Sequence, residues 1–151
     1  MLLLDDSRVD VNLANDYGQT PLSWAAEKGH KEVVQLLLDD SRVDVNLQTP
    51  LSGAAANGHK EVVQLLLDDS RVDVNLADNY GQTPLSRAAE NGHKDVVQLL
   101  LDDSRVDVNF ADNYCQTPLS RAAENEHKEV LQLLHDDPSV DVNPNDSTTR
   151  S

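Results

Sequence analysis

Short apolar segments recur along the chain and are separated by longer polar stretches. In the segment KEVVQLLL, residues 31–38, five of the eight positions are valine or leucine. A helix of this composition has little polar face, so neighbouring elements must cover it on more than one side. The pattern therefore predicts a buried helix over residues 31–38 and at the equivalent positions further along the chain.

A second and less apolar helix is predicted before each buried one. Thr20 can cap a helix whose first residue is Pro21, because the amide hydrogen that proline lacks would be unpaired there in any case. We expect this helix over residues 21–28. Gly29 then allows a turn with positive φ into the next helix.

The stretch that follows each buried helix is irregular. Residues 68–82 contain the β-like sequence VDVN and the polar turn ADNYG, which suits the tip of a hairpin. Each unit is thus predicted to consist of a helix, a turn, a second helix and a protruding hairpin-like loop.

These elements repeat along the chain. The string LLLDDSRVDVNL stands at residues 2–13 and recurs unchanged at 36–47, and the TPL triplets begin at residues 20, 49, 83 and 117, in steps of 29, 34 and 34. Such periods are typical of stacked units whose core lies between neighbours. The prediction is one elongated all-α domain, with a truncated half-unit at 1–13, units at 14–47, 48–76 (shortened), 77–110 and 111–144, and a disordered tail at 145–151.

The segment GQTPLSWAAEKGHKEVVQLLL, residues 18–38, resembles the ankyrin repeat, whose pattern is G-x-T-P-L-H-x-A-A-x-x-G-H followed by V-V-x-L-L-L. The match recurs four times in register over nearly the whole chain. The resemblance implies an ankyrin-type α-solenoid of about four repeats with an N-terminal half-repeat. It also implies a non-enzymatic protein–protein interaction module that needs no cofactor.

The chain departs from the ankyrin pattern in two ways. Serine occupies the family's histidine position in every unit, and the string LLLDDSRVDVN is one residue longer than usual. With TPLSRAAENGH, this variant is similar to the ankyrin arrays of fungal receptor-type multidomain proteins. There, such arrays are thought to act as recognition segments.

The resemblance places a binding surface on the hairpin tips and on the inner face of the first helices. Positions 24, 27 and 28 share one helix face, and substitutions between units gather there, which fits either partner contact or drift on a solvated face. For Trp24 two roles stay open, an anchor for a partner or packing on the neighbouring unit. The loop tyrosines recur at one hairpin position, which favours packing within the scaffold over contact with a partner. The candidate partner-binding residues are Tyr17, Gln19, Trp24, Glu27, Lys28, Asp78, Asn79, Tyr80, Arg87, Glu90, Asn91, Asn113, Tyr114, Arg121, Glu124 and Asn125.

Charge narrows the kind of partner. The formal net charge is −15 and the acidic residues are spread through every unit, which makes nucleic acid and anionic membrane poor partners. A protein with a basic or mixed-charge surface is expected instead.

The single cysteine, Cys115, excludes an intrachain disulfide, and the apolar start is too short for a signal peptide. We expect an intracellular protein, in the cytoplasm with the nucleus left open as an alternative, and a monomer unless the N-terminal end stacks on another copy.

Neither a metal site nor a catalytic site is predicted. His30, His59, His93 and His127 recur at unit spacing, but neighbours in a stack line up without converging on one ion. The ankyrin resemblance implies instead that these histidines hydrogen-bond backbone at the inter-helix turn. Cys115 stands where other units have glycine, and its only candidate bases are these histidines.

The second unit carries two defects. Between Leu47 and Gln48 the five residues equivalent to 77–81 are missing, which removes a whole hairpin tip. About ten residues still join residue 39 to residue 48, and at roughly 3.3 Å each they can bridge the gap. Gly53 within the first helix costs about 0.5–1 kcal/mol relative to alanine. Stacking can therefore survive the deletion, whether or not it stays regular, and we predict that this unit is the weak link of the array.

Both ends depart from a capped array. The chain opens within a second helix, and near the other end Glu126 replaces the turn glycine while His135 replaces a core leucine. An alternative to an independent binding module is therefore a detached or decayed fragment of a larger multidomain receptor-type protein, with no activity of its own.

Overall fold

The computed structural model of the protein describes residues 8–142, and the helices there form consecutive antiparallel pairs. No strand occurs within these residues, so the all-α prediction is confirmed, and the hairpin-like loops are built from turns. The helices are α1 (Pro21–Lys28), α2 (Lys31–Leu38), α3 (Pro50–Ala56), α4 (Lys60–Leu67), α5 (Pro84–Glu90), α6 (Lys94–Leu101), α7 (Pro118–Glu124) and α8 (Lys128–Asp136).

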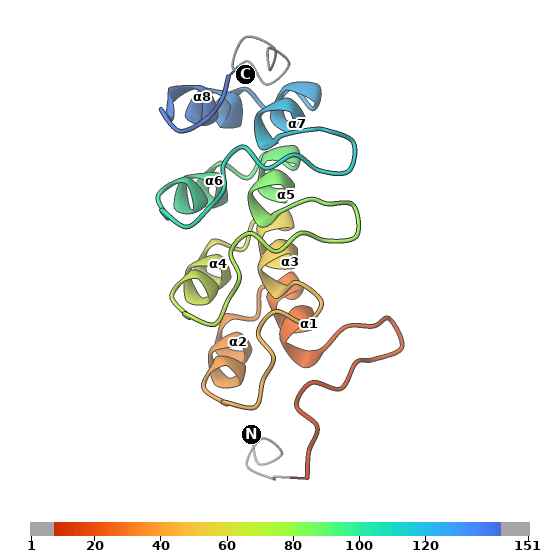
Figure 1. Ribbon diagram of the computed structural model, residues 1–151. Helices are drawn as coiled ribbons and strands as arrows, with labels where there is room; N and C mark the ends of the chain where they lie inside the picture. The colour runs from red at the N-terminus through yellow and green to blue at the C-terminus, as the bar shows by residue number, and fades with distance from the viewer. Residues whose placement is uncertain (1–7, 143–151) are drawn as a thin grey trace.

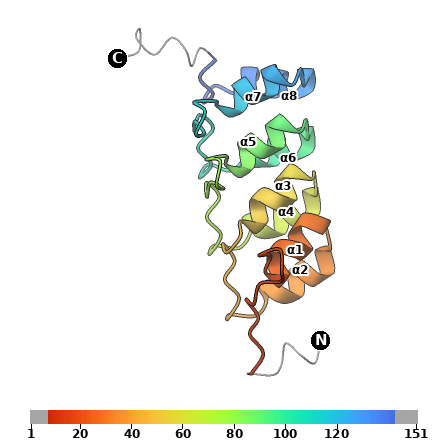
Figure 2. The ribbon, with the colours of Figure 1, turned by 90° about the vertical axis from the view of Figure 1, so that its right-hand side faces the viewer.

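The pairs stack into an elongated array with two helical layers (Figure 1). The first helices α1, α3, α5 and α7 form one column, and the second helices α2, α4, α6 and α8 form another beside it. The long loops project from the side of the first helices and lie in a row along one edge of the stack (Figure 2). Each helix therefore packs mainly on its pair and on the equivalent helices of adjacent units.

Caps fix where the first helices begin. The hydroxyl of Thr20 accepts a hydrogen bond from the amide of Ser23 at 3.1 Å, and the Ser23 hydroxyl accepts one from the Thr20 amide at 2.9 Å. This reciprocal arrangement pairs two donors that the helix itself leaves unpaired. Thr83 and Thr117 cap α5 and α7 through the amides of the equivalent serines. The serine of each TPLS motif thus belongs to the cap.

The turn between the two helices of a unit requires positive φ. Gly29, Gly58 and Gly92 adopt φ of 78°, 73° and 74° there. In the last unit Glu126 adopts φ of 58°, a region that costs a residue with a Cβ roughly 1–2 kcal/mol. The substitution is therefore tolerated in the fold but strained.

The second helices supply the core between units. In α4, Val62, Val63 and Leu66 are all at most 1% exposed, as predicted for a helix covered on both sides. The same sequence in α2 is less well covered, because Val33 and Leu36 are 41% and 39% exposed. Within the described residues α2 packs on a following second helix but on no preceding one, which explains the difference.

Histidines link each unit to the one before it. The Nε2 atoms of His59, His93 and His127 lie 2.8 Å from the backbone carbonyl oxygens of Glu27, Ala56 and Glu90, respectively. These contacts confirm the predicted backbone hydrogen bonds for three of the four histidines. His30 stacks instead on Trp24, with 5.1 Å between ring centroids.

Asparagines of the VDVN motifs form a second link, an asparagine ladder. Each Oδ1 accepts a hydrogen bond from an aspartate amide of the next unit, and each Nδ2 donates to a carbonyl there. The asparagine–aspartate pairs are Asn12–Asp44, Asn46–Asp73, Asn75–Asp107 and Asn109–Asp141. Their separation is 32 residues in three cases and 27 in the second, so the five-residue deletion leaves the ladder intact.

The deletion instead disturbs the start of α3. Gln48 and Thr49 adopt positive φ of 62° and 47°, and Thr49 makes no side-chain cap. Nevertheless, α3 packs against both α1 and α5. Unit two therefore stays stacked between its neighbours despite the deletion. The expected helical remnant at residues 2–4 and the tail at 145–151 lie outside the described residues.

Candidate functional site

One edge of the stack gathers most of the residues that the sequence analysis selected. We call it the finger face, formed by the loops at residues 15–19, 78–82 and 112–116 and by the solvent-exposed side of α1, α3, α5 and α7. Figure 2 shows the loops in a row along the edge of the stack, to the left of the helices. The three loops are called fingers one, three and four after their units, because unit two has none.

Each finger is a tight turn held by its first side chain. In finger one, Oδ1 of Asn15 accepts hydrogen bonds from the amides of Tyr17 and Gln19 at 2.9 and 3.0 Å. The amide of Asn15 in turn donates to the carbonyl of Gln19 at 2.8 Å. An aspartate at the first position does the same in the other fingers. This closed turn leaves the tyrosine at its tip in solvent.

Fingers three and four are joined directly. The amide of Asn113 donates to the carbonyl of Tyr80 at 3.0 Å, and its side-chain amide donates to the carbonyl of Asn79 at 3.1 Å. Finger one has no neighbour of this kind, because the adjacent finger is deleted. The two joined fingers therefore form a more extended edge than finger one does.

Arginines of the first helices fasten these two fingers. Nε of Arg87 donates to Oδ2 of Asp78 at 2.7 Å, and Nε of Arg121 donates to Oδ2 of Asp112 at 2.8 Å. Each guanidinium also lies 5.7 Å from the ring centroid of the tyrosine at its own finger tip. The arginines are thus structural partners of the fingers, and their remaining surface lies beside an exposed aromatic ring.

Asp112 is the most enclosed charge of the finger face. Its side chain is 1% exposed. Burial raises the pKa of this carboxyl, but hydrogen bonds from the Gln116 amide, the Arg121 guanidinium and the Tyr114 amide outweigh burial and hold the pKa below its usual value. Finger four is therefore anchored by an ionised carboxylate.

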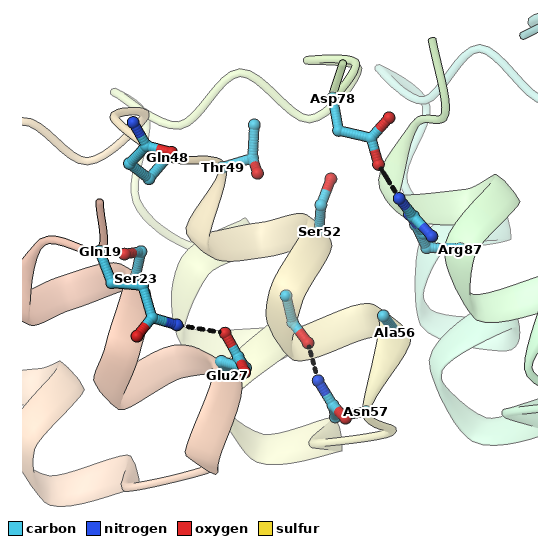
Figure 3. Close-up of a pocket in the computed structure, with 11 residues that line it drawn as sticks. Gln19, Ser23, Glu27, Gln48, Thr49, Ser52, Ala56, Asn57, Asp78 and Arg87 are labelled. Atoms are coloured by element: carbon cyan, nitrogen blue, oxygen red, sulfur yellow. Dashed lines mark hydrogen bonds and ion pairs between the residues drawn. The ribbon is translucent and has the colours of Figure 1, made fainter. Parts of the chain in front are cut away.

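Unit two contributes a groove in place of a finger. The groove has a volume of about 350 Å³ and lies between finger one and finger three (Figure 3). Gln19, Glu27, Ser52, Gly53 and Asn57 are among the residues that line it, with Asp78 and Arg87 on the far side. It is the part of the finger face where the surface is hollowed.

Comparison with known proteins identifies the family. The family model described as "Ankyrin repeats (3 copies)" matches residues 1–78 and 51–146, which together span nearly the whole chain. The chain belongs to the ankyrin repeat family. No curated protein matches it. Ankyrin repeats are in general protein–protein interaction modules, and the family is typically non-enzymatic.

The ankyrin array places all sixteen candidate residues at its surface, and none is buried. Tyr17, Tyr80 and Tyr114 are 88%, 56% and 64% exposed, and Trp24 is 40% exposed. Asn91 and Asn125 also close their helices, since each side chain donates to the carbonyl of the arginine four residues earlier. The structure brings tyrosine, aspartate and arginine together in units three and four, whereas Trp24 lies apart in unit one.

Several residues of this ankyrin surface were not selected from the sequence. Asp112 holds Arg121, and Ser52, Gly53 and Asn57 line the groove. The five-residue deletion was the signal that could have identified the groove residues, because a missing finger uncovers the helix beneath it. Asp112 could have been found from its alignment with Asp78.

Three further observations concern metal binding, the cysteine and the membrane. Within residues 8–142, no group of three or more histidine, cysteine, aspartate or glutamate side chains is arranged to hold a metal ion. Cys115 is exposed and adopts φ of 63° at the position where other fingers have glycine. In this same part of the chain, none of the helices has the length and apolar character needed to cross a membrane.

Proposed function

We propose that the finger face binds a segment of a partner protein and that this binding, without catalysis, is the function of the chain. The observation that carries the proposal is the row of exposed tyrosines at the finger tips, together with the exposed Trp24 on the first helix of unit one. Aromatic residues and arginines are enriched among the residues that dominate binding energy at protein interfaces. Here both types lie on one side of a rigid stack.

The geometry supports binding by a preformed surface. Arg87 and Arg121 hold fingers three and four against the first helices, and Asn113 joins the two fingers. The side chains of this edge are therefore already ordered before a partner binds, which lowers the entropic cost of association. Tyr80 and Tyr114 supply exposed aromatic area on the same edge.

Charge supports a partner with basic or mixed-charge surface. The chain carries a formal net charge of −15, and a field of that sign accelerates encounter with cationic surfaces. Nucleic acid and anionic membranes are negatively charged like the chain, so the same field repels them.

We further propose that the chain acts as a monomer in the cytoplasm, where an exposed thiol such as Cys115 stays reduced.

The proposal is tested by capture on the immobilised chain followed by quantitative mass spectrometry. Proteins captured by the wild type should be lost, by about tenfold or more, from both Trp24→Ala and Tyr80→Ala. Gln64→Ala, which truncates an exposed side chain of α4 on the other layer, is the control and should retain them. Equal capture by the wild type and both finger-face variants would contradict the proposal.

A further inference from the structure

In the fourth unit an arginine fills the space between a first helix and the unit before it. Arg121 extends from α7 toward the preceding unit, where its Nη1 lies 3.8 Å from Oε1 of Glu90. The same guanidinium pairs with Asp112 of its own finger through Nη2 at 2.7 Å. One arginine thus neutralises an acid of the preceding unit and an acid of its own finger.

The second unit lacks this arginine and this finger, but the unit before it keeps the acid. Gly53 occupies the position of Arg121, and Glu27 occupies the position of Glu90. A Cβ atom placed on Gly53 would lie 3.5 Å from Cβ of Glu27, so a side chain at position 53 would run alongside the glutamate. Gln19 donates to Oε2 of Glu27 at 2.6 Å, and Oε1 receives no hydrogen bond from residues 8–142.

In the described part of the chain, the groove over Gly53 has one further unpartnered polar atom, the hydroxyl of Ser52. Its volume of about 350 Å³ is within the range of roughly 300–1,000 Å³ found for ligand clefts. Ser52 is 4% exposed and its Oγ has no hydrogen-bond partner among the described residues. In Figure 3 this hydroxyl is directed into the space between Thr49 and Asp78. Ser86 also has an unpartnered hydroxyl, but it does not line this groove.

We propose that the groove between Glu27 and Ser52 is a binding site for an arginine side chain of the partner protein. The partner's guanidinium takes the place that the chain's own arginine occupies in unit four. It donates to Oε1 of Glu27 and, as a planar group with several donors, has a further N–H for the Ser52 hydroxyl. This inference rests on the proposed function, for which it names the chemistry of one contact.

The charge of the groove agrees with this occupant. Asp78, on the far side, is already neutralised by Arg87, so Glu27 is the acid left for an incoming cation. A guanidinium presents a fixed fork of donors that can reach two separated acceptors. A lysine ammonium is a compact, strongly hydrated charge without such a fork, so it fits the two acceptors less well. The net charge of −15 disfavours an anionic occupant.

The inference is tested by NMR titration of the full chain with N-acetyl-arginine methylamide. One anchored side chain corresponds to a dissociation constant in the millimolar range, so the titration extends to about 50 mM. We expect saturable shifts of the amide signals of Gly53 and Asn57. N-acetyl-citrulline methylamide has nearly the same shape but no charge, and it should give no saturable shift. The lysine analogue should bind more weakly than the arginine probe.

Three variants test the assignment of the groove. Glu27→Gln keeps an acceptor for Gln19 and should weaken the arginine probe by about fivefold. Gly53→Arg fills the groove and should abolish binding, whereas Gly53→Ala leaves the groove open and should retain it. Absence of saturable shifts in the wild type, equal binding of the citrulline or lysine probe, or binding unchanged by Glu27→Gln or Gly53→Arg would overturn the inference. Because the probes are small molecules, that failure is distinguishable from a failure of partner capture.

Discussion

The imidazole Nε2 of His93 lies 2.8 Å from the carbonyl oxygen of Ala56, which precedes it by 37 residues in the chain. The side chain leaves the start of α6 and reaches the last residue of α3, so it fixes the third unit on the second. The hydrogen bond satisfies a carbonyl that the end of α3 leaves without an intrahelical partner.

Replacing His93 with alanine is expected to lower the free energy of unfolding by about 1–2 kcal/mol, because the Ala56 carbonyl loses its partner between two packed units. Urea unfolding followed by circular dichroism measures the change. His30→Ala is the matched control, since His30 stands at the same position of unit one but stacks on Trp24. Equal losses in the two variants would contradict the role assigned to the hydrogen bond.

Leu66→Ala should lower the free energy of unfolding by about 2–5 kcal/mol, the usual cost of removing a core leucine. Leu66 is 0% exposed between its neighbours, whereas Leu36 of α2 is 39% exposed. Leu36→Ala should therefore cost clearly less in the same urea experiment. A cost below about 0.5 kcal/mol for Leu66→Ala would refute the sandwiched position of α4.

Gly53→Ala should raise the free energy of unfolding by about 0.5–1 kcal/mol, because alanine is the better residue within a helix. The added Cβ meets Glu27 at an ordinary contact distance of 3.5 Å. Gly58→Ala is the opposite case, since Gly58 has φ of 73° and a Cβ there would lie 2.6 Å from Nδ1 of His93. Thermal unfolding should shift upward for the first variant and downward for the second. Stabilisation by both would show that backbone entropy alone governs these positions.

Asp112→Asn tests the anchor of finger four through its pH dependence. The pKa of Asp112 is lowered from 3.8 in the folded chain, so the ionised group stabilises the fold above that value. At pH 7 the variant should be less stable by about 1–2 kcal/mol. As the pH falls below the ordinary value of 3.8, the carboxyl of the unfolded chain takes up a proton first and the folded carboxylate does so only below its lowered pKa, so the difference should shrink over this range. Urea unfolding from pH 7 to pH 2 measures it, and a difference independent of pH would exclude the charge as its source.

The sequence predicted the regular parts of the array closely because local signals determine them. The Thr20–Pro21 pair sets the start of α1, Gly29 sets its end, and the observed helices α1 and α2 span the predicted residues 21–28 and 31–38. Repetition strengthens the start signal, since the same threonine cap recurs at α5 and α7.

The contacts of the finger face were less accessible from sequence. Whether Arg87 faces a partner or its own finger depends on the distance between α5 and Asp78, which is set by the fold of the loop and by no periodicity. The position of Ser52 depends on the positive φ of Gln48 and Thr49, which the deletion imposes. Contacts of this kind arise between segments, so helix and turn propensities do not reveal them.

The asparagine ladder also has an evolutionary consequence. The pair Asn46–Asp73 keeps its hydrogen bond across 27 residues, while its counterparts span 32. A change in the number of codons within a finger is therefore absorbed in the loop and at the start of the helix that follows, where Gln48 and Thr49 take positive φ, while the ladder is kept. Mutations that lengthen, shorten or erase fingers can accumulate in descendants of this gene while the stack is inherited unchanged, so the outer edge is free to diversify first.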